Sequence, residues 1–146
     1  MFPDINNYDF LTEEETIAEQ LNPELGTVPL FDFNKGDYVV KDGKVVLCDK
    51  RQAVLQWVGF LVKTAYGKFR CYDGSDFGTY IENYIGYKEL GFVSSEIKRE
   101  LEEKCTMNRA ILGIDNFDAE KVADKLHISF TVLLNDNTEM EAQIDV

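Results

Sequence analysis

The sequence predicts an α+β domain in which a small antiparallel sheet carries helices on one face and ends in a carboxyl-terminal β-hairpin. Three patterns lead to this fold class. An Asp-Gly turn separates two short β-rich runs, segments with helical periodicity follow, and the last third of the chain alternates apolar and polar residues. An acidic amino-terminal arm precedes these elements.

The first region of the domain, residues 30–47, predicts short strands around tight turns. Leu30 to Phe33 and Tyr38 to Val40 flank turn residues, and Asp42-Gly43 leads into Val45 to Leu47. Asp-Gly between β-rich runs is typical of a two-residue hairpin turn. We therefore expect a hairpin centred on Gly43.

A long helix follows the hairpin. Asp49 and Gln52 have the spacing of a capping box, which predicts a helix that begins there and runs to about Tyr66. Its polar positions form only a narrow stripe, so we expect this helix to be buried on most of its circumference. A glycine-rich and aromatic loop from Gly67 to Gly78 and a short helix from about Thr79 to Tyr84 come next.

A second long helix is predicted after this loop. Ser94 is expected to cap it, and its apolar residues continue to about Met107. The polar residues Glu100 and Lys104 have the spacing of an exposed ion pair on one helix face.

The last third of the chain has the period of β-strands. A less regular strand is expected near Leu112 to Glu120, and two clearly alternating strands follow at Leu126 to Leu134 and Met140 to Val146. Asn135-Asp136-Asn137 supplies the turn between the last two. This order predicts an antiparallel meander with one face in water.

Charge separates the chain into two parts. The 146 residues contain 15 Lys and Arg against 27 Asp and Glu, a formal charge of −12. Residues 1–30 contribute −7 of this and contain no Lys or Arg, so we expect them to form an acidic arm before a domain at residues 31–146. Two arrangements of the arm stay open: it lies on a partner or on its own domain, or it is a loosely ordered terminus with one short helix from Glu13 to Leu21 capped by Thr12.

The composition also excludes several classes of protein. The negative charge would repel phosphate backbones and no basic cluster interrupts it, so we expect no binding to nucleic acid. No apolar run has the length of a membrane span, and residues 1–10 lack the pattern of a signal peptide, so we expect a soluble, unexported chain that does not bind membranes.

Candidate chemistry is sparse. His127 is the sole histidine and lies on the polar face of a predicted strand, where no second imidazole accompanies it. Asp73, Asp76 and Glu82 do not match a calcium loop, and a chain this acidic offers such groups by chance. We therefore predict no catalytic residue, no metal site and no cofactor. The three dispersed cysteines, expected to be reduced, are Cys48, Cys71 and Cys105.

Aromatic residues are concentrated between positions 66 and 92. Rings of this kind around glycine turns favour an interaction surface, and the alternative is a second small core under a long loop. The residues are Tyr66, Phe69, Tyr72, Phe77, Tyr80, Tyr84, Tyr87 and Phe92.

Several short features follow one another in an order that resembles a known family. They are Phe31-Asp32-Phe33, the hairpin around Gly43, the helix Gln52 to Thr64 with Gln56-Trp57, the aromatic loop ending in Phe77-Gly78, Tyr84-Ile85-Gly86, the helix Ser95 to Cys105, and Leu126 to Val132. In this order the sequence resembles the baseplate wedge and sheath-initiator family of contractile phage tails and phage-tail-like bacteriocins, which includes prophage tail proteins. That family is similar to a baseplate subunit of type VI secretion. The resemblance excludes the acidic arm.

The resemblance implies a non-enzymatic structural subunit of a contractile tail baseplate. Such a subunit is present in six copies and templates the first sheath ring by β-strand pairing. Its implied partners are the sheath protein, the baseplate wedge and the inner-tube or hub proteins. The resemblance further implies assembly in the bacterial cytoplasm and a place in a phage tail or tail-like particle.

The resemblance, together with the alternating strands, gives two sets of candidate site residues. Many relatives carry a Glu-Arg or Glu-Pro-Arg signature after the long helix that grips the wedge, and this chain departs from it. Alignment from Thr64 places Ala65-Tyr66 at the signature, whereas alignment from Gly67 places Lys68-Phe69-Arg70 there, which keeps an Arg but no Glu. In the second alignment the Arg70 guanidinium suits carboxylates and carbonyls. The expected wedge contact is Lys68, Arg70, Tyr72 and Phe77. The expected sheath interface is Leu126, Ile128, Phe130, Val132, Leu134, Met140, Ala142, Ile144 and Val146.

Two other functions stay open at this point. The −7 charge of the arm would suit a soluble regulatory adaptor that binds a basic partner protein. An enzyme acting on peptidoglycan is a weaker alternative, because no residue pattern supports it.

Overall fold

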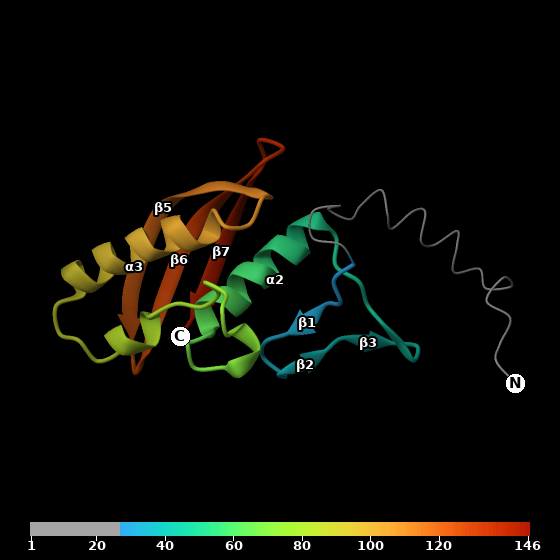
Figure 1. Ribbon diagram of the computed structural model, residues 1–146, viewed down its shortest axis with the longest axis horizontal. Helices are drawn as coiled ribbons and strands as arrows, with labels where there is room; N and C mark the ends of the chain where they lie inside the picture. Colours follow the sequence, from blue (N-terminus) through green and yellow to red (C-terminus); the bar gives the residue numbers. More distant parts are fainter. Residues whose placement is uncertain (1–26) are drawn as a thin grey trace, which may run out of the picture. The chain divides into compact units, whose positions relative to one another are not determined.

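The computed structural model describes residues 27–146 and has the α+β fold class that the sequence predicts (Figure 1). The chain divides into two compact units, with the boundary between Ala53 and Val54. The helix expected from Glu13 to Leu21, with its cap at Thr12, lies outside the described residues.

The described part of the first unit, residues 27–53, contains two small antiparallel hairpins. Asp42 and Gly43 have φ angles of 53° and 75°, which are the positive values of a two-residue hairpin turn, so the predicted hairpin is confirmed. In the first hairpin, the Phe31 ring meets Phe33 and Tyr38 edge to face, with ring centroids 5.2 and 5.3 Å apart. The paired strands are β1 (Phe31–Asp32) with β2 (Asp37–Tyr38) and β3 (Val40–Lys41) with β4 (Lys44–Val45).

Helix α2 (Lys50–Lys63) begins at the predicted capping box. The Gln52 N–H donates to Asp49 Oδ1 at 2.8 Å, and the Asp49 N–H donates to Gln52 Oε1 at 3.1 Å. The helix ends before the expected Tyr66, because the chain at Ala65 leaves the helix to form a parallel bridge with Thr79. Its fully buried side chains are Val54, Val58 and Leu61.

Two short 3₁₀ helices, η2 (Arg70–Tyr72) and η3 (Ile81–Tyr84), precede helix α3 (Leu90–Cys105). The predicted cap at Ser94 is wrong, since α3 begins one turn earlier and Glu89 occupies the N-cap position. The reason lies in packing: Val93 is 2% exposed and extends the buried stripe of Ile97, Leu101 and Cys105 toward the amino end of the helix.

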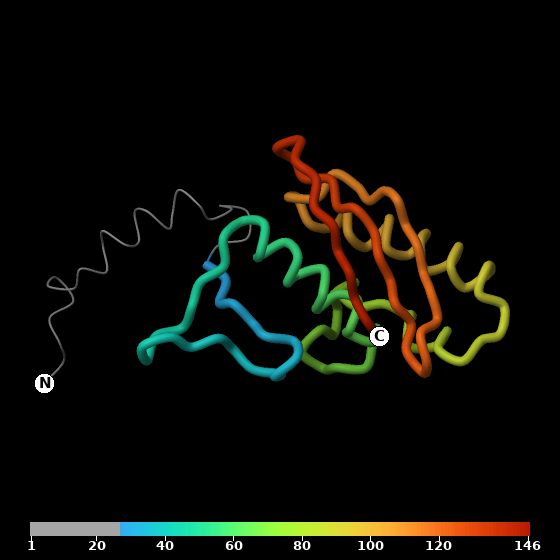
Figure 2. The backbone as a smooth tube through the Cα atoms, turned by 180° about the vertical axis from the view of Figure 1, so that it is seen from behind, coloured from blue at the N-terminus to red at the C-terminus, as the bar shows by residue number. Residues whose placement is uncertain are grey.

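The carboxyl third forms the predicted meander, a sheet in the order β5-β6-β7. Helix α3 packs against β5, and the opposite face of the sheet is turned toward the viewer in Figure 2. Along β6 and β7, buried side chains facing the helices alternate with half-buried or exposed ones, which gives the sheet one buried and one wet face, whereas β5 is less regular. The strands are β5 (Ile111–Val122), β6 (Lys125–Leu134) and β7 (Glu139–Asp145).

Candidate interaction surfaces

The side chains of the expected sheath interface lie in the core. Within β6 and β7 they are at most 8% exposed, and Val146 after β7 is half-buried. Phe130 stacks on Phe117 of β5 with ring centroids 6.4 Å apart, which ties two strands together under the helices. In the structure these side chains are therefore covered by the domain itself, and the outward side chains of the two strands are the more accessible ones.

The pairing order identifies β7 as an edge strand, whereas β6 is paired on both sides. Leu126 and Val146 exchange both backbone hydrogen bonds at 2.9 Å, which fixes the alternation of the ladder. By that alternation, the N–H and C=O groups of Glu141, Gln143 and Asp145 point away from β6. Within residues 27–146, no hydrogen bond reaches these outward backbone groups.

The opposite edge of the sheet, along β5, is irregular. Its register with β6 shifts twice, between Ile111 and Gly113 and between Asp115 and Asp118. Asn116 in the second irregularity has a φ of 50°, a value that bends the strand locally. Bulges of this kind obstruct edge-to-edge pairing, so β7 is the edge suited to accept another strand.

The wet face of the sheet is acidic. The pairing register aligns Glu120, His127 and Asp145 in one row across the three strands, and His127 Nδ1 lies 2.5 Å from Asp145 Oδ1. The hydrogen bond with His127 is the main reason that the pKa of Asp145 lies below its ordinary value. The carboxylates on this face are Asp115, Asp118, Glu120, Glu139, Glu141 and Asp145.

The four residues of the expected wedge contact lie together in the loop between α2 and η3. Lys68, Arg70 and Tyr72 are exposed, whereas Phe77 is half-buried between Tyr72, at 4.7 Å, and Trp57 of α2, at 5.8 Å between ring centroids. Within the described residues, the Arg70 guanidinium makes no hydrogen bond or ion pair. We call residues 66–80 the aromatic loop.

The base of the aromatic loop is closed by backbone pairing. The Thr79 N–H donates to Thr64 O at 2.9 Å, and the Tyr66 N–H donates to Thr79 O at 3.0 Å. Gly78 sits inside this crossing with a φ of 111°, and a Cβ there would lie 3.0 Å from the Tyr66 Cα. Glycine is therefore required at this position by both conformation and space.

Helix α3 holds the aromatic loop through two side chains whose function the sequence did not reveal. Glu100 Oε1 accepts a hydrogen bond from the Tyr80 N–H at 2.7 Å, and Lys104 Nζ donates to Asp76 O at 2.6 Å while lying 4.5 Å from the Tyr66 ring centroid. Glu100 is only 8% exposed, so the expectation of an exposed Glu100–Lys104 pair is wrong. Burial raises the pKa of this carboxyl more than the hydrogen bond and the nearby Lys104 lower it.

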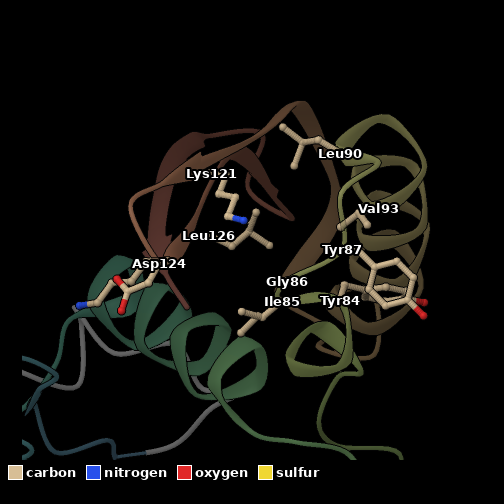
Figure 3. A pocket seen from close by; sticks show the side chains of 10 residues that line it. Tyr84, Ile85, Gly86, Tyr87, Leu90, Val93, Lys121, Asp124 and Leu126 are labelled. Carbon is tan, nitrogen blue, oxygen red and sulfur yellow. The ribbon is translucent and has the colours of Figure 1, made fainter.

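A shallow pocket lies between the chain entering α3 and the β5–β6 turn (Figure 3). Aliphatic and tyrosine side chains line most of it, charged residues at the β5–β6 end complete the lining, and Lys121 lies beside Leu126. It lacks the convergent polar groups that fix a small ligand. Its lining residues are Tyr84, Ile85, Gly86, Tyr87, Leu90, Val93, Lys121, Asp124, Lys125 and Leu126.

Reactive groups in the described part of the chain are scattered. Residues 27–146 contain no cluster of three or more side chains that could hold a metal ion. Asp73, Asp76 and Glu82 do not converge into such a cluster. Burial raises the pKa of the Cys105 thiol to about 12, so this cysteine is a packing residue, and Cys48 is buried as well.

Comparison with known proteins places the chain in a family. The family model of the contractile injection system sheath initiator matches residues 27–137, and a search of curated proteins finds no match. Among the described residues, no helix is both long and apolar enough to cross a membrane. Since the family match covers well over half of the sequence, the chain belongs to the contractile injection system sheath initiator family, structural components of phage tails and related systems that interact with sheath and baseplate subunits.

Proposed function

We propose that this sheath initiator templates the first sheath ring by pairing its strand β7 with a strand of a sheath subunit. The observation that carries the proposal is the regular outer edge of β7, where Glu141, Gln143 and Asp145 direct backbone groups away from β6. A strand added there would continue the meander by main-chain hydrogen bonds. This role requires no catalysis, no metal and no cofactor.

In this proposal, the expected sheath-interface side chains stabilise the β7 edge by packing in the core. Met140, Ala142 and Ile144 anchor β7 in the core, and the apolar residues of β6 hold the central strand. Because the β7 edge is already formed before a strand is added, the initiator loses little conformational entropy when it pairs.

We further propose that the aromatic loop contacts the baseplate wedge. Lys68, Arg70 and Tyr72 project from the loop, and the packing of Phe77 between Tyr72 and Trp57 gives it a fixed shape. Since the Arg70 guanidinium has no partner among residues 27–146, it suits bidentate binding of a carboxylate or of carbonyl groups. Six copies, contacts with inner-tube or hub proteins and assembly in the bacterial cytoplasm belong to the same proposal.

A proline at Gln143 tests strand pairing directly. The Gln143 N–H points away from β6, so Gln143→Pro removes an outward donor without removing a hydrogen bond of the β6–β7 ladder. We expect particles carrying this variant to have baseplates and tubes but little or no sheath. Gln143→Thr, which keeps the N–H, is the matched control and should support normal sheaths. Normally sheathed particles with the proline variant would overturn the proposal.

The folded state of both variants must be measured alongside. Circular dichroism and urea unfolding of the purified chains show whether the proline has damaged the domain itself. Should Gln143→Pro unfold the chain, Gln143→Cys carrying a bulky maleimide adduct covers the same edge after folding, and loss of sheath assembly is again the expected result.

A further inference from the structure

We infer that the strand recognised by β7 alternates basic side chains on the wet face of the sheet with apolar side chains on the helix-facing side. The inference rests on the proposed strand pairing and adds to it the chemistry of the partner. It follows from the two rows of side chains that β7 presents to its unpaired side.

The first row is on the wet face. In an antiparallel sheet, directly opposed residues share a face, and their Cβ atoms lie about 5 Å apart. Residues of an added strand opposite Glu141 and Asp145 would therefore stand beside two carboxylates. Lysine or arginine at those positions makes favourable cross-strand pairs, whereas aspartate or glutamate would place like charges directly opposite each other.

Among the described residues, the carboxylates of this face outnumber the cations beside it. Glu141 accepts a hydrogen bond from the neutral Gln143 amide at 2.8 Å, and Asp145 is hydrogen-bonded to His127 and lies within electrostatic reach of Lys125 and Lys63. Strand β5, two strands away from this edge, adds carboxylates at Asp115 and Asp118. The negative electrostatic potential over this face therefore attracts cationic side chains, both while a partner strand approaches and after it has paired with β7.

The second row faces the helices. Met140, Ala142 and Ile144 are 5%, 3% and 8% exposed, so the inner row of β7 is apolar along its whole length. An added strand extends the sheet beyond this row, and its inward side chains become cross-strand neighbours of Met140, Ala142 and Ile144. Valine or isoleucine at alternate positions fits that environment, whereas charged groups would be buried without partners.

Short peptides fused to a soluble carrier test this partner chemistry on the full-length chain. Each peptide has about seven residues, the length of an ordinary strand, with valine at alternate positions. The intervening residues are lysine in one peptide, glutamine in the second and glutamate in the third. We expect the lysine peptide to bind about tenfold more tightly than the glutamine peptide and the glutamate peptide to bind least, because each opposed charge pair adds a modest increment.

Charge reversal of the edge separates charge recognition from strand pairing. In the double variant Glu141→Lys with Asp145→Lys, we expect the order of the lysine and glutamate peptides to reverse. Raising the salt concentration should reduce the difference between peptides for both proteins. Equal binding of all three peptides to the unmodified chain would overturn the basic-strand inference.

The proline variant distinguishes the two ways of failing. If all peptides bind equally and Gln143→Pro abolishes their binding, strand pairing stands and only the charge inference is wrong. If the lysine peptide binds Gln143→Pro as tightly as the unmodified chain, attraction to the acidic face does not involve the edge and both proposals are wrong.

Discussion

Glu100 of α3 and the backbone of Tyr80 are joined by a 2.7 Å hydrogen bond that connects the second long helix to the base of the aromatic loop. Glu100 is 8% exposed, so its carboxyl pairs with a specific donor in a largely buried site. A surface used for binding gains precision when helices rather than other loops position it. The two side chains of α3 that reach the loop supply this support.

Glu100 gives the first prediction. Glu100→Ala leaves the Tyr80 N–H without its acceptor and should lower the free energy of unfolding by about 1–2 kcal/mol. Glu100→Gln keeps an acceptor and removes the buried charge, so it should be at least as stable as the unmodified chain at neutral pH. Urea unfolding of the two variants measures both effects.

The same carboxyl predicts a pH dependence. Because burial raises the pKa of Glu100 in the folded chain, the folded state holds this proton more tightly than the unfolded state. The contribution of Glu100 to the free energy of unfolding therefore falls as the pH rises from the ordinary glutamate pKa through the raised pKa of the folded chain. Glu100→Gln lacks this dependence, so its stability advantage should shrink as the pH falls through that window. An advantage that does not change with pH would contradict the assignment.

Lys104 gives the second prediction. Lys104→Met keeps the aliphatic stem but removes the donor to Asp76 O and the cation over the Tyr66 ring. We expect a loss of about 1 kcal/mol in unfolding free energy and faster amide exchange in the aromatic loop. Lys98→Met is the matched control. Within residues 27–146 that amine makes only an exposed 4.0 Å pair with Glu102, so the change should alter stability by less than about 0.5 kcal/mol. Equal effects of the two substitutions would contradict the anchoring of the loop by Lys104.

Gly78 gives the third prediction. Gly78→Ala combines a φ of 111° with a Cβ only 3.0 Å from the Tyr66 Cα, so it should destabilise the chain by about 2–3 kcal/mol. Gly74→Ala also has a positive φ, 80°, but meets open space, and it should cost about 1 kcal/mol. Thermal or urea unfolding compares them. If the Gly78 variant were as stable as the Gly74 variant, the backbone around Gly78 and Tyr66 could move apart at little cost, and the prediction would be wrong.

The contact between His127 and Asp145 gives the fourth prediction. His127→Ala should return the Asp145 pKa upward toward its ordinary value, because the hydrogen bond with His127 is the main cause of its depression. A carboxyl with a lowered pKa contributes stability above its ordinary pKa and loses it as the pH falls through the lowered value. Side-chain carboxyl titration by NMR measures the shift, and an unchanged Asp145 pKa in the variant would contradict the assignment.

Local patterns explain what the sequence predicted well. The Asp-Gly turn, the capping box of Asp49 and Gln52, and the alternation in the last strands each depend on residues a few positions apart. Their physics is therefore contained in short stretches of sequence. The resemblance to the sheath initiators, which the family match confirms, depended on the order of such local features.

The errors arose where distant parts of the chain meet. Ser94 is a good N-cap by itself, but burial of Val93 extends α3 beyond it. Glu100 has the spacing of a surface ion pair, yet the loop at Tyr80 covers it from 20 residues away. The sequence could not predict that β7 is an edge strand, because this depends on the strand order of the sheet. Alternation shows which side chains are buried but not which strand lies at the edge.

The most direct test of the central claim is electron cryomicroscopy of the contractile particle at the junction of baseplate and first sheath ring. The account predicts a strand of a sheath subunit beside β7, hydrogen-bonded to the backbone of Glu141 and Gln143 and carrying basic side chains over Glu141 and Asp145. A first ring that leaves the outer edge of β7 in solvent, or that contacts the initiator only through side chains elsewhere, would contradict it.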